Sequence, residues 1–279
     1  MVFFTGDIGP LEHWPPYNGA PYKSMPTAIV RICTTEGIVI AADGFEASFL
    51  RVENQHLQKI YPIHNLPLAY AIFGSTGMRI YPDKPIINLI EEAKKSVDAL
   101  EGCSFDDLSL YAEHFSCPIQ EALRMKMEDG SITCYPSLPE KNEPGHTILH
   151  IFFFGYYRGI ASTIDLRFFH REHVLAKPSI TSIDMDIGPP PWIRGSSIIA
   201  ELLFDSDDER FSAYRIAFPE KPSDLTINKA AEIAANYIMA CSSAVARDAD
   251  PNLTMHIGGH IHIAKITPSG GFEWIIPPR

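Results

Sequence analysis

The chain has 279 residues, of which 46% are hydrophobic and 20% charged, as in ordinary globular proteins and unlike disordered or fibrous ones. Acidic residues outnumber basic ones by 34 to 23, and this net charge of −11 argues against a general nucleic-acid binder, which needs lysine and arginine. No apolar run approaches the roughly 18 residues of a membrane span, and the N-terminus lacks the pattern of a secretory signal. Five cysteines without a CxxC pair favour a reducing compartment. We therefore expect a cytoplasmic protein that binds neither nucleic acid nor membrane.

Residues 1–26 differ in composition from the rest of the chain. They contain five prolines, which exclude a helix or a central strand over this stretch. Two interpretations are open: an irregular extension that lies over the body of the protein, or a propeptide. We therefore divide the chain into an extension over residues 1–26 and a folded domain over residues 27–279.

From Thr27 onward, β-branched residues predict a strand over residues 27–34 and a second over residues 38–42, joined by a turn that contains Gly37. Two more strands are predicted over residues 59–63 and 66–73. Four strands in succession favour an antiparallel sheet.

The spacing of apolar residues then changes to that of helices. Further along the chain we predict, in order, helices over 85–100 and 108–127, a loop over 131–145, a hairpin of strands over 146–154 and 159–169, helices over 196–203 and 227–246, and strands over 257–267 and 271–276. Ser223 or Thr226 could cap the long helix that begins at Ile227. Two groups of helices among antiparallel strands predict one α+β domain, with two packed sheets and helices outside them.

The first hairpin brings residues with catalytic chemistry to one edge of the sheet. With its turn near residue 35, residues pair when their numbers sum to about 71, so that Thr27 lies opposite Gly44 and beside Asp43. Lys59 begins the next strand and could reach the same edge. Its ammonium would favour deprotonation of the Thr27 hydroxyl, and Asp43 would orient Lys59 and balance its charge. Threonine in strands and Asp-Gly at strand ends are also common for structural reasons alone.

The same residues carry a resemblance to a known family. Residues 27–43 resemble the opening of a proteasome β-type subunit, in which a threonine begins one strand and a VVLAAD-like strand follows a turn. Residues 59–63 resemble the family's lysine-led strand, and residues 73–77 its AGxxGD turn. Arg247-Asp248 and residues 258–267 resemble the RD and GGxIxxAVIT motifs near the C-terminus. The resemblance covers about residues 27–276 and implies a four-layer αββα sandwich.

The family consists of N-terminal nucleophile hydrolases, and the resemblance implies a role for each matching residue. Thr27 would act as nucleophile once it is the first residue, with its own α-amino group, of ordinary pKa near ~8, as general base. Gly74 would supply the N–H that stabilises the oxyanion. Lys59 and Asp43 would maintain the charge and geometry of the site, and Asp248 matches an accessory acidic residue. The implied activity is that of a threonine-type peptidase that needs no cofactor or metal.

On this interpretation residues 1–26 are a propeptide, which the chain removes by cleaving its own Pro26–Thr27 bond. The substrate would be a peptide or protein, held in an apolar pocket beside the nucleophile that is lined by Glu46, Leu57 and Ile72. Family members stack in rings, so a homo-oligomer is also implied.

Other features of the sequence keep alternatives open. Pro26 stands where the family has a glycine and narrows the conformations available to an N-to-O acyl shift. Residues 188–191 are Gly-Pro-Pro-Pro where an SGS-like turn is expected, and Ile257 stands where another serine is expected. A non-catalytic scaffold or binding subunit is therefore the main alternative, and a non-peptide amide hydrolase is a third. Retention of both Asp43 and Lys59 favours activity, because a structural subunit has no chemical need for that pair.

Three further patterns have structural explanations. His256, His260 and His262 lack a cysteine or carboxylate partner at metal-binding spacing, and we interpret them as exposed or hydrogen-bonded strand histidines. The aromatic run over residues 152–157 predicts core packing between layers. The acidic residues 205–209 lack the spacing of a calcium loop and predict a solvated helix end.

Overall fold

The computed structural model describes residues 27–48, 51–74, 77–78, 87–128, 146–171, 174–183, 185, 191–251 and 257–279. The Pro-rich extension, the expected loop over residues 131–145, residues 188–190 and His256 lie outside the described residues. The described part is a mixed α+β structure with two antiparallel sheets and several helices. Its helices include none that is both long enough and apolar enough to cross a membrane.

The first sheet contains the hairpin that begins at the N-terminal end of the described chain. All its neighbouring strands are antiparallel. Its order is β13 (Trp192–Arg194), β1 (Ile29–Cys33), β2 (Ile38–Asp43), β14 (Ile261–Thr267) and β15 (Gly271–Ile276). Strand β13, which the sequence analysis did not predict, lies along β1 and brings the residues that follow it to the same end of the sheet as Thr27.

The second sheet is built around the long hairpin of β9 and β10. Its order is β11 (Val174–Leu175), β10 (Ile160–Arg171), β9 (His146–Tyr157), β6 (Leu68–Gly74) and β5 (Ile60–Ile63), and β12 (Ser179–Ile183) also pairs with β10. Two small pairs accompany the sheets: β3 (Glu46–Ser48) with β4 (Arg51–Asn54), and β7 (Gly77–Met78) with β8 (Ile87–Asn88).

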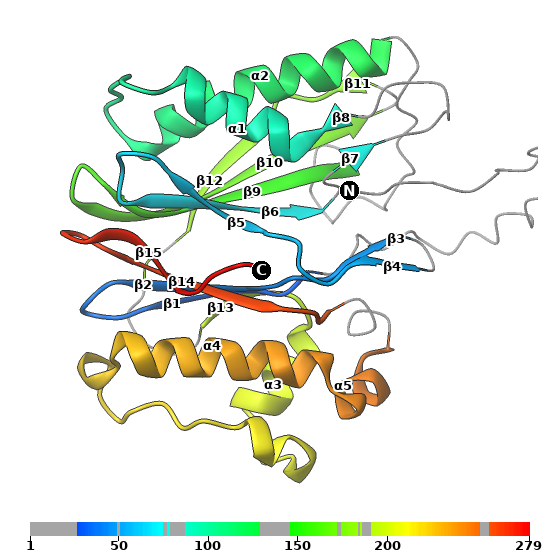
Figure 1. Ribbon diagram of the computed structural model, residues 1–279, viewed down its shortest axis with the longest axis vertical. Coiled ribbons are helices and arrows are strands. Elements are labelled where there is room, and N and C mark those ends of the chain that lie inside the picture. Colours follow the sequence, from blue (N-terminus) through cyan, green and yellow to red (C-terminus); the bar gives the residue numbers. More distant parts are fainter. Residues whose placement is uncertain are drawn as a thin grey trace, which may run out of the picture.

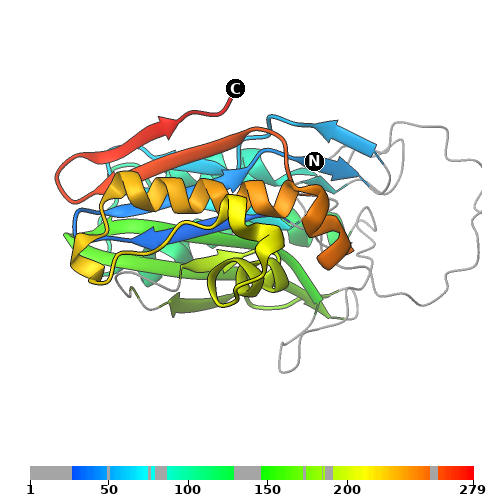
Figure 2. The same ribbon diagram turned by 90° about the horizontal axis from the view of Figure 1, so that it is seen from below.

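Helices cover the outer face of each sheet, so that the elements form four layers (Figure 1). The second sheet is covered by α1 (Leu89–Ala99) and α2 (Leu108–Glu128). The first sheet is covered by α3 (Ser197–Phe204), α4 (Ile227–Ser242) and α5 (Ala244–Ala249), with the short 3₁₀ helices η2 (Glu209–Tyr214) and η3 (Pro222–Asp224) between α3 and α4. Figure 2 shows α4 lying over the first sheet, roughly along the direction of its strands.

Strand alternation distributes the aromatic run of β9 between two cores. Phe152 and Phe154 point between the sheets, where both pack against Trp192. Phe153 points to the opposite face and packs edge-on against Phe115 of α2. Successive strand residues face opposite sides, so one strand can fill both layers. The prediction that this run belongs to the core is confirmed.

Two predicted elements differ from the observed ones because of local backbone geometry. The helix predicted over residues 227–246 is two helices, because Ser243 has extended dihedral angles and caps α5 through the N–H of Ala246. Thr226, and not Ser223, caps α4. The last strand pair begins at Ile261 instead of residue 257, since Gly259 has a φ of +74° and a Cβ there would lie 2.6 Å from the Gln55 oxygen.

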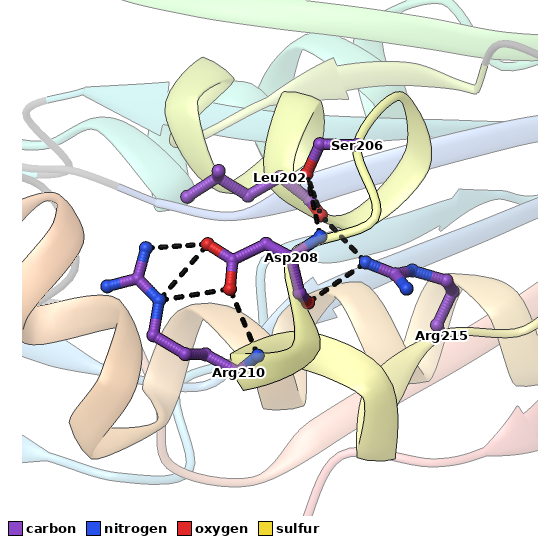
Figure 3. Close-up of polar contacts among 5 residues, drawn as sticks. All are labelled: Leu202, Ser206, Asp208, Arg210 and Arg215. Carbon is purple, nitrogen blue, oxygen red and sulfur yellow. Dashed lines mark hydrogen bonds and ion pairs between the residues drawn. The ribbon is translucent and has the colours of Figure 1, made fainter.

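The acidic stretch after α3 is held by hydrogen bonds at the end of that helix (Figure 3). Arg215 donates to the main-chain oxygens of Leu202 and Asp208, and Ser206 also donates to the Leu202 oxygen. The Asp208 carboxylate caps η2 and binds the guanidinium of Arg210. The sequence analysis interpreted residues 205–209 as a solvated helix end. Helix α3 ends at Phe204, directly before them, in agreement with that interpretation.

Candidate active site

The first hairpin places Thr27 and Asp43 at one end of the first sheet. Its pairs, such as Ile29 with Ala42, have numbers that sum to 71, so the predicted register is confirmed. Beyond the last pair, the Asp43 N–H donates to the Ala28 oxygen at 3.1 Å, and the Ala28 N–H donates to Asp43 Oδ1 at 2.9 Å. The carboxylate thus holds the main chain next to Thr27.

Lys59 completes the group from the second sheet. It precedes β5, and its Nζ lies 2.8 Å from Asp43 Oδ1 and 3.3 Å from Thr27 Oγ1. All three side chains are buried, with exposed fractions of 7% for Thr27, 0% for Asp43 and 4% for Lys59. A positive charge beside a hydroxyl stabilises its alkoxide, and here the neighbouring carboxylate balances that charge. The structure therefore brings together the three residues that the sequence analysis placed at this edge.

Asp43 is also bound from the other side of the site. Its Oδ2 accepts from the N–H of Phe45 at 3.2 Å and of Gly258 at 3.3 Å. With the bonds from Ala28 and Lys59, four donors surround the carboxylate, which matches the number an ionised carboxylate accepts. Because Gly258 begins the turn that leads into β14, the C-terminal part of the chain is tied to the N-terminal hairpin.

His262 contacts the site through the main chain of Lys59. Its Nε2 accepts the Lys59 N–H at 3.1 Å, and its ring packs edge-on against Trp274. Burial of the imidazole, and secondly the charge of Lys59, lower the pKa of His262 to about 3. The sequence analysis expected a hydrogen-bonded strand histidine, but it did not connect this residue with Lys59. In the part of the chain that the structure describes, no three potential metal ligands lie together.

Ser196 and Asp250 form a buried pair that the sequence analysis missed. The expected serine-containing turn was assigned to residues 188–191 and considered lost, yet a serine follows β13 at the start of α3. The Ser196 hydroxyl donates to Asp250 Oδ2 at 2.6 Å and also caps α3. The preceding Gly195 packs against α4, since a Cβ there would lie 2.7 Å from the Tyr237 hydroxyl oxygen. The sequence signal that could have revealed Ser196 is the Gly-Ser-Ser of residues 195–197 before an apolar run, which is typical of a helix N-cap.

Two other predicted site residues, Gly74 and Asp248, belong to elements other than the hairpin. Gly74 is the last residue of β6, two residues beyond Ile72, whose N–H donates to the Lys59 oxygen. Asp248 lies in α5. The pKa of the Arg210 guanidinium is raised chiefly by its hydrogen bond to Asp208, and the negative charge of Asp248 raises it further.

The predicted pocket residues belong to two parts of the fold. Ile72 is only 2% exposed and lies in the core between the second sheet and helices α1 and α2. Leu57 packs against the same core. Glu46 is in β3, and its side chain is outside the described part of the structure.

The chain matches no model of a known protein family and no curated protein. The chemistry available at the site therefore follows from its geometry. The Lys59 ammonium lies within hydrogen-bond range of both the Thr27 hydroxyl and the Asp43 carboxylate in a buried position. This arrangement can activate the hydroxyl as a nucleophile if a base is present to take its proton.

Proposed function

We propose that the protein is a threonine-type peptidase of the N-terminal nucleophile class, with the fold of a proteasome β-type subunit. The observation that carries the proposal is the position of the Lys59 ammonium between Asp43 Oδ1, at 2.8 Å, and Thr27 Oγ1, at 3.3 Å. The sequence motifs that resemble the proteasome β family are a second line of support, and they point to the same three residues. The four-layer arrangement of helices and sheets is compatible with this class.

The burial of this group argues for a chemical role. A lysine that is taken out of water loses hydration energy, which a single ion pair seldom regains. Asp43 also accepts from three main-chain N–H donors, of Ala28, Phe45 and Gly258, so Lys59 supplies one of the four hydrogen bonds to its oxygens. An ammonium beside the Thr27 hydroxyl would stabilise the alkoxide, and this effect accounts for a buried lysine better than structural stabilisation does.

The proposed reaction begins when the hydroxyl of an N-terminal Thr27 attacks the carbonyl carbon of a peptide bond. The α-amino group of Thr27 takes the hydroxyl proton, while Lys59 stabilises the negative charge on Oγ. The Gly74 N–H stabilises the oxyanion of the tetrahedral intermediate. The intermediate expels the amine, which takes up the proton, and leaves an ester on Oγ. Water then hydrolyses the ester, releasing the carboxylic acid and restoring the Thr27 hydroxyl.

The same nucleophile would release its own N-terminus. Oγ of Thr27 attacks the carbonyl carbon of Pro26, and cleavage of the C–N bond leaves Pro26 esterified to Oγ and the Thr27 nitrogen as an amine. Hydrolysis of that ester frees residues 1–26 with a C-terminal carboxylate. We propose peptide or protein substrates, and a homo-oligomer in which the mature chains assemble.

A second candidate function is that of a non-catalytic subunit that keeps residues 1–26. It is favoured by the 7% exposure of Thr27, which leaves little of the nucleophile open to a substrate in the uncleaved chain. The two candidates differ in one measurable property, the N-terminus of the purified protein.

The test is the intact mass and N-terminal sequence of the protein during incubation, followed by hydrolysis of peptide esters and amides. We expect a chain that begins at Thr27, and we expect Thr27→Ala to abolish both processing and hydrolysis. Thr35→Ala, at an exposed turn of the same hairpin, is the control and should retain both. A chain that keeps residues 1–26 under all conditions, or hydrolysis that survives Thr27→Ala, would overturn the proposal. Hydrolysis of simple amides without peptides would indicate a non-peptide amide hydrolase.

A further inference from the structure

We propose that His262 is a positioning residue that holds the main chain of Lys59, and thereby sets the distance from the lysine ammonium to the Thr27 hydroxyl. The inference rests on the proposed function for the effect on catalysis. The hydrogen bond itself can be tested without any activity. His262 does not touch the Thr27 hydroxyl and acts through Lys59.

Lys59 is held between the two sheets. On one side its main-chain oxygen accepts the N–H of Ile72, in the second sheet, at 3.1 Å. On the other side its N–H donates to Nε2 of His262, in the first sheet, at 3.1 Å. Without His262 this buried N–H would lose the acceptor that the structure provides for it. The imidazole therefore serves as the link between the first sheet and the lysine.

The geometry requires a neutral imidazole with its proton on Nδ1. A nitrogen that accepts a hydrogen bond cannot carry a proton, so Nε2 must be unprotonated. His262 is 0% exposed, and the nearby Lys59 ammonium disfavours a second positive charge. Burial and the charge of Lys59 lower the pKa of His262, and they outweigh a hydrogen bond to the His260 main chain, which raises it. The neutral form thus has its acceptor nitrogen aimed at Lys59.

The segment from Gly258 to His262 makes three successive contacts with the site and with the loop that precedes Lys59. The Gly258 N–H binds Asp43, the His260 N–H binds the Gln55 oxygen at 2.7 Å, and the His262 ring binds Lys59. The first two contacts use main-chain N–H donors of this segment, and only the third depends on a side chain of β14. A change at residue 262 therefore removes the third contact while the first two can persist.

The experiment compares two replacements of His262 in the processed protein. Gln can place its side-chain oxygen near the position of Nε2, whereas Phe keeps a ring without an acceptor. We expect His262→Phe to lower kcat by about 10- to 100-fold, with KM changed less than about twofold, because a small misplacement of a catalytic group slows chemistry more than binding. His262→Gln should recover kcat to within about threefold of the wild type.

Lys265→Met, farther along β14, is the matched control, because the Lys265 ammonium pairs with Glu273 of β15 and not with the site. Its kcat should equal that of the wild type. Equal kcat for the Phe and Gln variants at position 262, whether both are slow or both are unaffected, would overturn the inference.

A measurement that needs no turnover separates this inference from the proposed function. Imidazole ¹⁵N chemical shifts of the full chain at neutral pH should show His262 as the Nδ1–H tautomer, with Nε2 unprotonated. A protonated Nε2 would overturn the inference even if the enzyme is active. Absence of hydrolysis together with the expected tautomer would overturn the catalytic effect and the proposed function, and leave the hydrogen bond established.

Discussion

Single residues at the candidate site combine burial with charge. Lys59 and Asp43 form an ion pair with side chains that are 4% and 0% exposed, and each has further hydrogen bonds to the main chain or to Thr27. A buried pair of this kind adds little stability over apolar residues, but removal of one partner leaves an uncompensated charge. Substitutions here should therefore affect stability as well as activity.

Lys59→Met should lower the free energy of unfolding by about 3 kcal/mol, since Asp43 would remain buried without its cation. The double variant Lys59→Met with Asp43→Asn should recover part of that loss. Urea unfolding at pH 7 measures both. Lys95→Met is the control, because the Lys95 pair with Glu92 lies at the surface and its loss should leave the unfolding midpoint nearly unchanged. A loss at Lys59 no larger than that of the control would contradict the prediction.

The depressed pKa of His262 predicts a pH dependence of stability. The folded protein holds this imidazole neutral down to about pH 3, whereas the unfolded chain binds the proton near its ordinary pKa of 6.5. The contribution of His262 to stability is therefore complete above pH 6.5 and is lost as the pH falls toward 3, by roughly 1 kcal/mol per pH unit.

Urea unfolding of wild type and His262→Gln between pH 7 and pH 4 measures this contribution. The variant cannot titrate at this position, so its stability should fall less steeply with decreasing pH. Parallel curves for the two proteins would show that His262 is not buried in the neutral form.

At the scale of elements, short polar side chains decide where helices begin. Thr226 accepts the N–H of Lys229 at the start of α4, and Ser243 does the same for Ala246 at the start of α5. Ser243 also donates to the Ala240 oxygen at the end of α4. One serine thus ends one helix and begins the next, which explains why an uninterrupted alanine-rich pattern folds as two helices.

Thr226→Ala should reduce the free energy of unfolding by about 1 kcal/mol, because the first turn of α4 loses its cap. Ser223→Ala serves as the control, since the Ser223 hydroxyl is exposed and donates to the neighbouring Asp224 instead of capping α4. Thermal and urea unfolding of the two variants should separate them. Equal losses would mean that Thr226 does not act as the cap.

At the scale of the whole molecule, the layer between the sheets contains both aromatic and polar contacts. Arg31 of β1 donates to the Thr163 hydroxyl of β10 at 2.7 Å, and Arg194 of β13 lies 3.4 Å from Asp165 of β10. The Arg194 guanidinium also lies over the Phe152 ring. These contacts fix one sheet against the other, which the site requires because Lys59 comes from the second sheet and Thr27 from the first.

Phe152→Ala should lower the free energy of unfolding by about 3 to 5 kcal/mol, because the residue is fully buried between the sheets and its removal leaves a cavity. Ile160→Ala, at the exposed turn of the β9–β10 hairpin, should change it by less than about 0.5 kcal/mol. Denaturant titration provides both values. A loss below about 1 kcal/mol at Phe152 would contradict the assigned packing.

Local patterns in the amino-acid sequence were sufficient to predict the hairpin register, helix α2, the start of α4, and the grouping of Thr27 with Asp43. Each depends on residues close in the chain, where strand alternation, turn length and helical spacing determine the geometry. Lys59 was within reach of the same reasoning because it begins a nearby strand.

The contacts of His262 and of Ser196 could not be read from such patterns. Lys59 and His262 are 203 positions apart, and Ser196 and Asp250 are 54 apart. Their contacts depend on how the two sheets stack and on the pairing of β13 with β1. Local propensity carries no information on the partner of a strand or on the distance between layers. The linear order of residues thus determined which groups meet at the hairpin edge, and the packing of the sheets determined which side chains support them.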